Sequence, residues 1–123
     1  MFNIKTSFSS LKVWQIAFDY AIKVYKITGN FPVEEKYALS SQLKRASLSI
    51  AANIAEGKGR SSNKDFIRFL YIARGSLEES KSHLIFAKEL GYVSESDFIA
   101  ISKIAEEVGL TLNGLIKSLT KKL

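Results

Sequence analysis

The chain contains no cysteine, a single proline, a single histidine and no long run of apolar residues. The absence of cysteine excludes disulfide bonds and thiolate chemistry, and it fits a reducing, cytoplasmic location. No stretch approaches the roughly 18 apolar residues that a membrane span needs, and the amino terminus lacks the apolar core of a signal peptide. We therefore expect a cytoplasmic protein without a membrane segment.

The sequence has few residues arranged for catalysis. Glu79 and His83 are spaced to face one metal, but a di-iron bundle needs a Glu-x-x-His motif on each of two helices, and neither motif is present. An exposed helical pair is the favoured interpretation. Asn53 and Glu56 are better explained by capping of the helix end and an inter-helix hydrogen-bond network than by catalysis. We predict no enzymatic activity, no metal and no cofactor.

Helical spacing of apolar residues dominates the chain, and no strand pattern competes with it. The predicted helices cover residues 9–28, 33–57, 62–90 and 95–121. Short connections between helices of similar length favour an all-α, antiparallel, up-down-up-down four-helix bundle. The chain has no internal repeat and no obvious linker, so residues 1–123 are predicted to be one domain.

Local signals set the expected helix ends. Ser9 or Ser10 can cap the first helix, Pro32 suits the first turn of the second, and the second should end near Gly57. Capping pairs and a terminating glycine define the later helices: Ser62 with Asp65, Ser94 with Asp97, and Gly91.

Gly75 lies inside the expected third helix, where glycine costs about 0.5 to 1 kcal/mol relative to alanine. Close helix contact or subunit packing would offset this cost, and a local kink is the alternative.

Two helices carry more apolar surface than one intramolecular contact needs. The first helix has a second apolar series, and the second helix has a surface of small residues around one leucine. A homo-oligomer explains both surfaces, whereas the alternative is that alanine simply favours an exposed helix. The predicted oligomer interface consists of Val13, Ala17, Tyr20, Val24, Leu48, Ala51, Ala52 and Ala55.

Positive charge is concentrated in the middle of the chain. Of the net charge of +6, residues 1–43 contribute +2, residues 44–75 contribute +5 and residues 76–123 contribute −1. The central cations are candidates for a phosphate-binding surface on RNA or DNA. These candidates are Lys44, Arg45, Lys58, Arg60, Lys64, Arg68 and Arg74.

Ordinary surface ion pairs are the alternative use of this charge, for example Arg45 with Glu56 or Arg74 with Glu78. The segment GKGRSS is not a P-loop, because it lacks the glycine spacing and no strand precedes it. A closed oligomer would repeat a weak basic patch and increase its avidity for a polyanion.

Three segments resemble one known family. They are LKVWQIAFDYAIKVYKIT at 11–28, FPVEEKYALSSQLKRASLSIAANIAEGKGR at 31–60 and DFIRFLYIARGSLEES at 65–80. The sequence is similar to the 23S rRNA intervening-sequence protein family, to which the accessory variability proteins of diversity-generating retroelements are related. The resemblance covers almost the full chain.

The resemblance implies a left-handed antiparallel four-helix bundle that assembles into a homopentameric ring. It implies little enzymology, although the retroelement relatives look like basic assemblies that bind nucleic acid and a reverse transcriptase. We expect a non-enzymatic, ring-like homo-oligomer associated with nucleic acid or ribonucleoprotein. A purely protein-binding oligomeric scaffold is the alternative.

Overall fold

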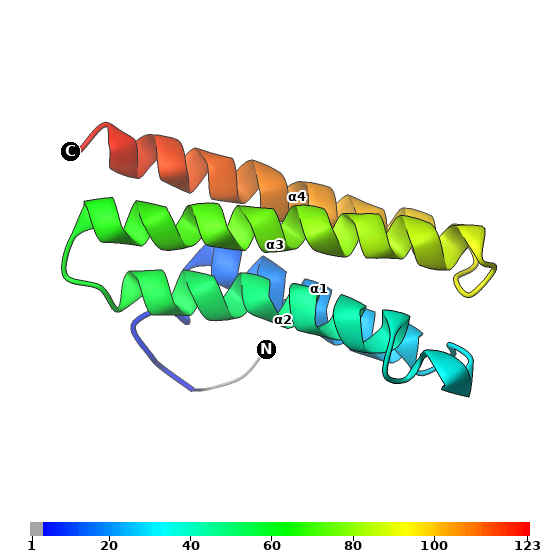
Figure 1. Ribbon diagram of the computed structural model, residues 1–123. Coiled ribbons are helices and arrows are strands. Elements are labelled where there is room, and N and C mark those ends of the chain that lie inside the picture. Colours follow the sequence, from blue (N-terminus) through cyan, green and yellow to red (C-terminus); the bar gives the residue numbers. More distant parts are fainter. Residues whose placement is uncertain (1–3) are drawn as a thin grey trace.

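The computed structural model describes residues 4–123, which fold into four long helices. The elements are α1 (Lys12–Thr28), the 3₁₀ turn η1 (Val33–Glu35), α2 (Leu39–Lys58), α3 (Asn63–Glu89) and α4 (Glu95–Thr120) (Figure 1). No strand occurs within this range, so the predicted all-helical class is confirmed. Over the same residues, no helix is long and apolar enough to cross a membrane.

Two helix starts differ from the prediction. The first helix begins at Lys12 without a side-chain cap, because the Ser9 hydroxyl instead accepts a hydrogen bond from the Thr6 amide at 2.9 Å. The second helix begins at Leu39 rather than at residue 33. Pro32 precedes only the short turn η1, and the Glu35 carboxylate then accepts the Leu39 amide hydrogen bond at 3.3 Å.

The other predicted end signals operate as expected. The hydroxyls of Ser62 and Ser94 accept hydrogen bonds from the amides of Asp65 and Asp97, each at 3.1 Å. After α3, Gly91 adopts a φ of 82°, which a residue with a side chain rarely does. The amides of Gly91 and Tyr92 bond back to the carbonyls of Lys88 and Ala87, which is the Schellman pattern of helix termination.

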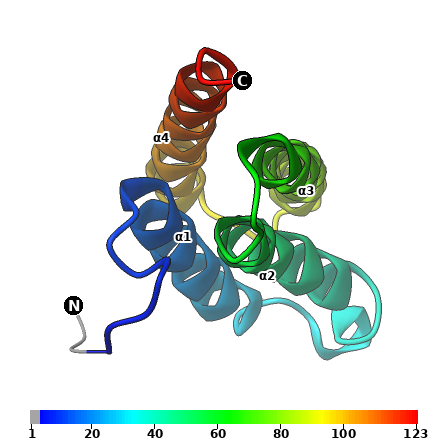
Figure 2. The same cartoon turned by 90° about the vertical axis from the view of Figure 1, so that its left-hand side faces the viewer.

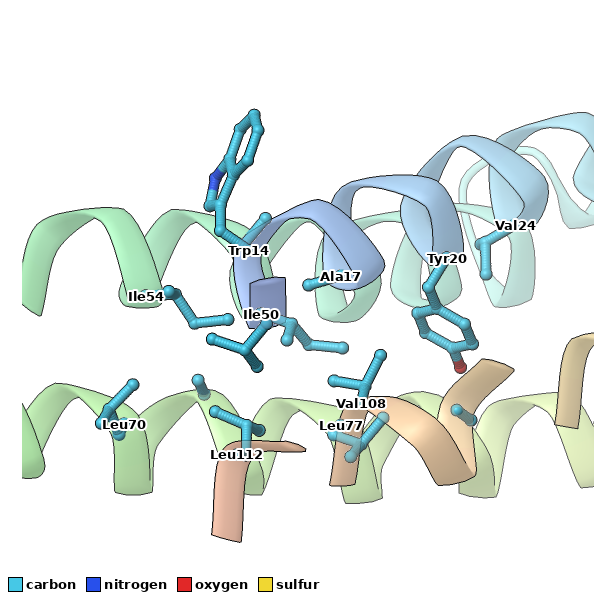
Figure 3. Close-up of a cluster of buried hydrophobic side chains, with 14 of the residues drawn as sticks. Trp14, Ala17, Tyr20, Val24, Ile50, Ile54, Leu70, Leu77, Val108 and Leu112 are labelled. Carbon is cyan, nitrogen blue, oxygen red and sulfur yellow. The ribbon is translucent and has the colours of Figure 1, made fainter. Parts of the chain in front are cut away.

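The four helices enclose one apolar core. Helix α1 packs against α2 and α4, and α3 packs against the same two helices (Figure 2). Side chains from all four helices meet in the centre, where they are almost completely buried (Figure 3). These include Ala17, Ile50, Leu70, Leu77 and Leu112.

The second apolar series of α1 belongs to this core. Val13, Ala17, Tyr20 and Val24 are at most 2% exposed, so they present no surface to another subunit. Their assignment to the oligomer interface is wrong. The physical reason is that α1 lies in a groove between α2 and α4 and is therefore buried on two sides.

The small-residue surface of α2 divides in two. Ala51 is only 7% exposed and packs in the core, so it too was wrongly assigned to the interface. Leu48 is 53% exposed, Ala52 is exposed and Ala55 is half-buried. These three residues remain available to a partner.

A buried polar contact crosses the core between α1 and α3. The Ser80 hydroxyl donates to the Leu77 carbonyl at 2.8 Å, so the Tyr20 hydroxyl, 2.8 Å from Ser80 Oγ, acts as the donor to Ser80. Burial raises the pKa of Tyr20 to about 12, although the Ser80 hydrogen bond opposes this shift.

Two glycines in long helices have different surroundings. A Cβ added to Gly57 would lie 2.8 Å from both Phe66 Cδ1 and Phe69 Cβ, whereas one added to Gly75 would meet nothing within 4 Å. Gly57 therefore permits the close approach of α2 to the first turns of α3. No close intramolecular contact explains Gly75, contrary to that part of the prediction.

We predict that Gly57→Ala lowers the free energy of unfolding by about 1 to 3 kcal/mol, because the new methyl group overpacks the α2–α3 contact. Gly75→Ala is the matched control and should raise stability by about 0.5 to 1 kcal/mol through helix propensity alone. Urea denaturation followed by circular dichroism measures both. Equal effects in the two variants would contradict the close-contact explanation.

We also predict that Tyr20 makes stability fall between pH 10 and pH 12. In that range the unfolded chain loses the phenolic proton while the folded protein keeps it, so deprotonation favours unfolding. At about 1.36 kcal/mol per pKa unit, the loss reaches about 2 to 3 kcal/mol. Comparing the pH profile of Tyr20→Phe isolates this contribution, and parallel profiles would refute it.

Candidate nucleic-acid interface

The turn from Gly59 to Ser62 joins α2 to α3 at one end of the molecule (Figure 1). The close contact at Gly57 and the Ser62 cap hold the two helix ends beside one another. Four of the seven predicted nucleic-acid-binding residues therefore lie close to this turn. We call Lys58, Arg60, Lys64 and Arg68 the basic turn.

The two arginines of the basic turn are already paired with carboxylates. Arg60 Nη2 lies 2.8 Å from Glu56 Oε1, and its Nε lies 3.7 Å from Asp65 Oδ2. Arg68 Nε donates to Asp65 Oδ1 at 3.0 Å. These carboxylates partly neutralise the arginines, as the alternative to phosphate binding anticipated.

Phe69 is a contributor to the basic turn that the sequence analysis did not single out. Its ring centre lies 4.7 Å from the Arg60 guanidinium and 4.5 Å from that of Arg68. Because the Phe69 ring is buried against α3, these two cation–π contacts keep both guanidinium groups close to the helix. Its helical core spacing gave no signal of this second role.

The two lysines of the basic turn differ from the arginines. Lys58 and Lys64 are exposed, and neither forms an ion pair with any of residues 4–123. An exposed, uncompensated ammonium group can approach a phosphate without first breaking a protein contact. Lys58 and Lys64 are therefore the strongest phosphate-binding candidates at the turn.

The remaining three candidates lie away from the turn. Lys44 is 14 residues before Lys58 on the same helix, about 21 Å at 1.5 Å per residue, and its ammonium group lies 5.4 Å from the Tyr25 ring centre. Arg45, one residue further on, borders a groove between α2 and α3. Arg74 donates to Asn113 on α4 at 3.1 Å. The seven predicted residues therefore do not form one patch.

The ion pairs considered as the alternative are replaced by other contacts. Glu56 pairs with Arg60 instead of Arg45. Arg74 contacts Asn113 and lies 4.6 Å from the Tyr71 ring centre, whereas Glu78 pairs with Lys81 at 3.1 Å.

A polar network links α2 to α3 beside the Arg45 groove. The Asn53 amide donates to the Ser49 carbonyl at 2.8 Å and to Ser49 Oγ at 3.0 Å, and the Ser76 hydroxyl donates to Ser49 Oγ at 2.9 Å. Asn53 therefore takes part in an inter-helix hydrogen-bond network, as its spacing had indicated. The network orients side chains between two helices and contains no nucleophile with an adjacent base.

The histidine lies in a local helical pair. His83 Nε2 is 3.1 Å from Glu79 Oε2, four residues earlier on α3. Among the residues that the structure describes, no three His, Cys, Asp or Glu side chains gather where they could hold a metal ion.

Two comparisons find known proteins that are similar to this chain over most of its length. The family model for the 23S rRNA-intervening sequence protein matches residues 9–114. A crystal structure of a protein of unknown function from the S23 ribosomal protein family of Bacteroides thetaiotaomicron is 26% identical, with a TM-score of 0.79. That match covers 85% of this chain and 95% of the other. No match is found among curated proteins.

Proposed function

Because the chain belongs to the 23S rRNA-intervening sequence protein family, we propose that it is a non-enzymatic homo-oligomer that binds nucleic acid through the basic turn. The observation that carries the nucleic-acid role is the pair of exposed, uncompensated lysines, Lys58 and Lys64, on the two sides of one turn. The net charge of +6 adds a long-range attraction for polyanions. A single-stranded RNA serves as the test polyanion.

The proposed assembly uses exposed apolar side chains of α1 and α2. The Lys44 ammonium group of α2 lies over the Tyr25 ring of α1. Because α2 turns back along α1, one turn forward from Lys44 reaches Leu48, and one turn back from Tyr25 reaches Ile22. We therefore expect Leu48 and Ile22 to be neighbours. Leu48, Ile22 and Tyr25 are all more than 40% exposed. This apolar surface continues to Ala52 and Ala55, which border a hollow with Phe8.

The antiparallel, left-handed bundle and the closed pentameric ring belong to the same proposal and come from the family resemblance. Turns at alternating ends of the molecule support the up-down-up-down order (Figure 1). In a closed ring, each subunit would contribute an identical basic turn, and avidity would strengthen weak individual contacts. The alternative is a purely protein-binding scaffold, with a reverse transcriptase as one partner that the retroelement resemblance implies.

We predict that Ala52→Arg weakens oligomer formation, because it puts bulk and charge into the proposed subunit contact. The protein should stay folded, because Ala52 is exposed in the single subunit. Light scattering with size-exclusion chromatography should detect smaller species, while circular dichroism retains the helical signal. Ala100→Arg on α4 is the control at another exposed alanine. Ala51→Arg should instead destabilise the fold, because Ala51 is buried.

A wild-type monomer at micromolar concentration would refute the oligomer. A closed ring of another size would refute only the pentamer. Association unchanged by Ala52→Arg would exclude this α1–α2 apolar surface as the contact.

For nucleic acid, we predict that Lys58→Glu with Lys64→Glu weakens binding to a labelled single-stranded RNA, measured by fluorescence anisotropy over a salt series. Each lost phosphate contact should lower the slope of log affinity against log salt by about 0.7. Arg60 and Arg68 are left intact because replacing them would also break their ion pairs.

The charge-matched control is Lys26→Glu with Lys36→Glu, two exposed lysines far from the basic turn. Equal losses in both double variants would indicate diffuse attraction by net charge. No binding by the wild type at low salt would reject the nucleic-acid role and favour the protein scaffold.

A further inference from the structure

The end of the molecule that carries the basic turn is built from four helix ends, of which α2 contributes its last turn. Helix α1 begins there, α3 begins there and α4 ends there (Figure 1, Figure 2). Phe8 shares a surface hollow with Gly59 and Arg60, which joins the segment before α1 to the turn. Lys12 borders a second hollow with Gly114 and Leu115 of α4. The segment before α1 therefore borders the turn, and the start of α1 borders α4.

The contacts between α3 and α4 locate the last lysines more closely. Arg74 of α3 bonds Asn113 of α4 at 3.1 Å, and α4 ends on the side where α3 begins. Lys121 follows Asn113 by eight residues, and Phe66 precedes Arg74 by eight, about 12 Å along each helix. Lys121 therefore lies at the same end of the molecule as the first turns of α3, which carry Lys64 and Arg68.

This end holds a large uncompensated positive charge. Its only carboxylate side chains, among residues 4–123, are those of Glu56 and Asp65, and both pair with Arg60 or Arg68. Six lysines here are exposed and form no ion pair within the described part of the chain. They are Lys12, Lys58, Lys64, Lys117, Lys121 and Lys122.

The opposite end of the molecule carries acidic residues close to two turns. Glu34, Glu35, Glu89, Glu95 and Asp97 gather around the turns that follow α1 and α3. Lys88 there pairs with Glu95 at 2.8 Å, and this hydrogen bond raises the Lys88 pKa. The Tyr92 hydroxyl donates to Glu35 at 2.9 Å, which raises the Tyr92 pKa. Lys26, Lys36 and Lys88 lie at this end too, so the carboxylates outnumber the cations only slightly, and a polyanion approaching the molecule is attracted chiefly to the basic end.

We infer that the entire basic end is one docking surface for an RNA backbone, in which Lys12, Lys117, Lys121 and Lys122 act together with Lys58 and Lys64. This inference rests on the proposed nucleic-acid role and extends it to residues from both ends of the sequence. Lysines on flexible stems contact phosphates as point charges, and a phosphate contact carries no sequence information. The surface therefore binds RNA with little sequence preference.

The test compares three charge-matched double variants by anisotropy with the same labelled RNA. Lys117→Glu with Lys121→Glu should lower the salt slope by about 1.4, about as much as Lys58→Glu with Lys64→Glu, because each pair removes two phosphate contacts. Lys26→Glu with Lys36→Glu should change the slope much less. Circular dichroism melting establishes that each variant is folded, and glutamine replacements at the same positions serve if charge reversal lowers stability.

The outcomes separate this inference from the function on which it rests. If the wild type and the turn variant behave as proposed but the Lys117 and Lys121 variant matches the Lys26 and Lys36 control, the shared surface is refuted and the basic turn alone binds RNA. If the wild type binds no RNA at low salt, the proposed function fails and the docking surface fails with it.

Discussion

The close approach of α2 to α3 at Gly57 is the constraint on which the rest of this structure depends. Because Gly57 has no side chain, the end of α2 can lie directly against Phe66 and Phe69. The connection to α3 can then be short, with Ser62 capping the new helix. The same contact places the Phe69 ring against the guanidinium groups of Arg60 and Arg68. Packing between α2 and α3 therefore also determines where these two cations lie.

Charge in this region is divided between two kinds of residue. The arginines are held by Glu56, Asp65 and an aromatic ring, which orders the turn at the expense of their free charge. The lysines of the basic turn form no ion pair within residues 4–123, and they are exposed to solvent. The basic turn is uniformly basic in the sequence, but in the structure its arginines stabilise the turn and its lysines are available for binding. Their side-chain contacts, which the sequence does not show, distinguish the two groups.

Expectations based on neighbouring residues were mostly accurate, whereas expectations about exposed faces were not. The Ser62, Ser94 and Gly91 signals succeeded because the bonds that end a helix join residues within five positions of one another. Helix α2 begins six residues later than predicted, after a 3₁₀ turn in which Glu35 accepts a hydrogen bond from the distant Tyr92. The second series on α1 was misassigned because helical periodicity reveals which faces are apolar but not how many neighbours cover them.

The sequence by itself determined the four helices, most of their ends and the basic character of the α2–α3 turn, because periodicity, capping and local charge act over a few residues. Only the tertiary structure decided that Val13, Ala17, Tyr20 and Val24 face the core, since that depends on α1 lying between α2 and α4. The tertiary structure also brought the lysines of early α1 and late α4 to the same end of the molecule as the basic turn. Electrostatic attraction depends on distance in space, and segments separated by most of the chain become neighbours only when the helices pack.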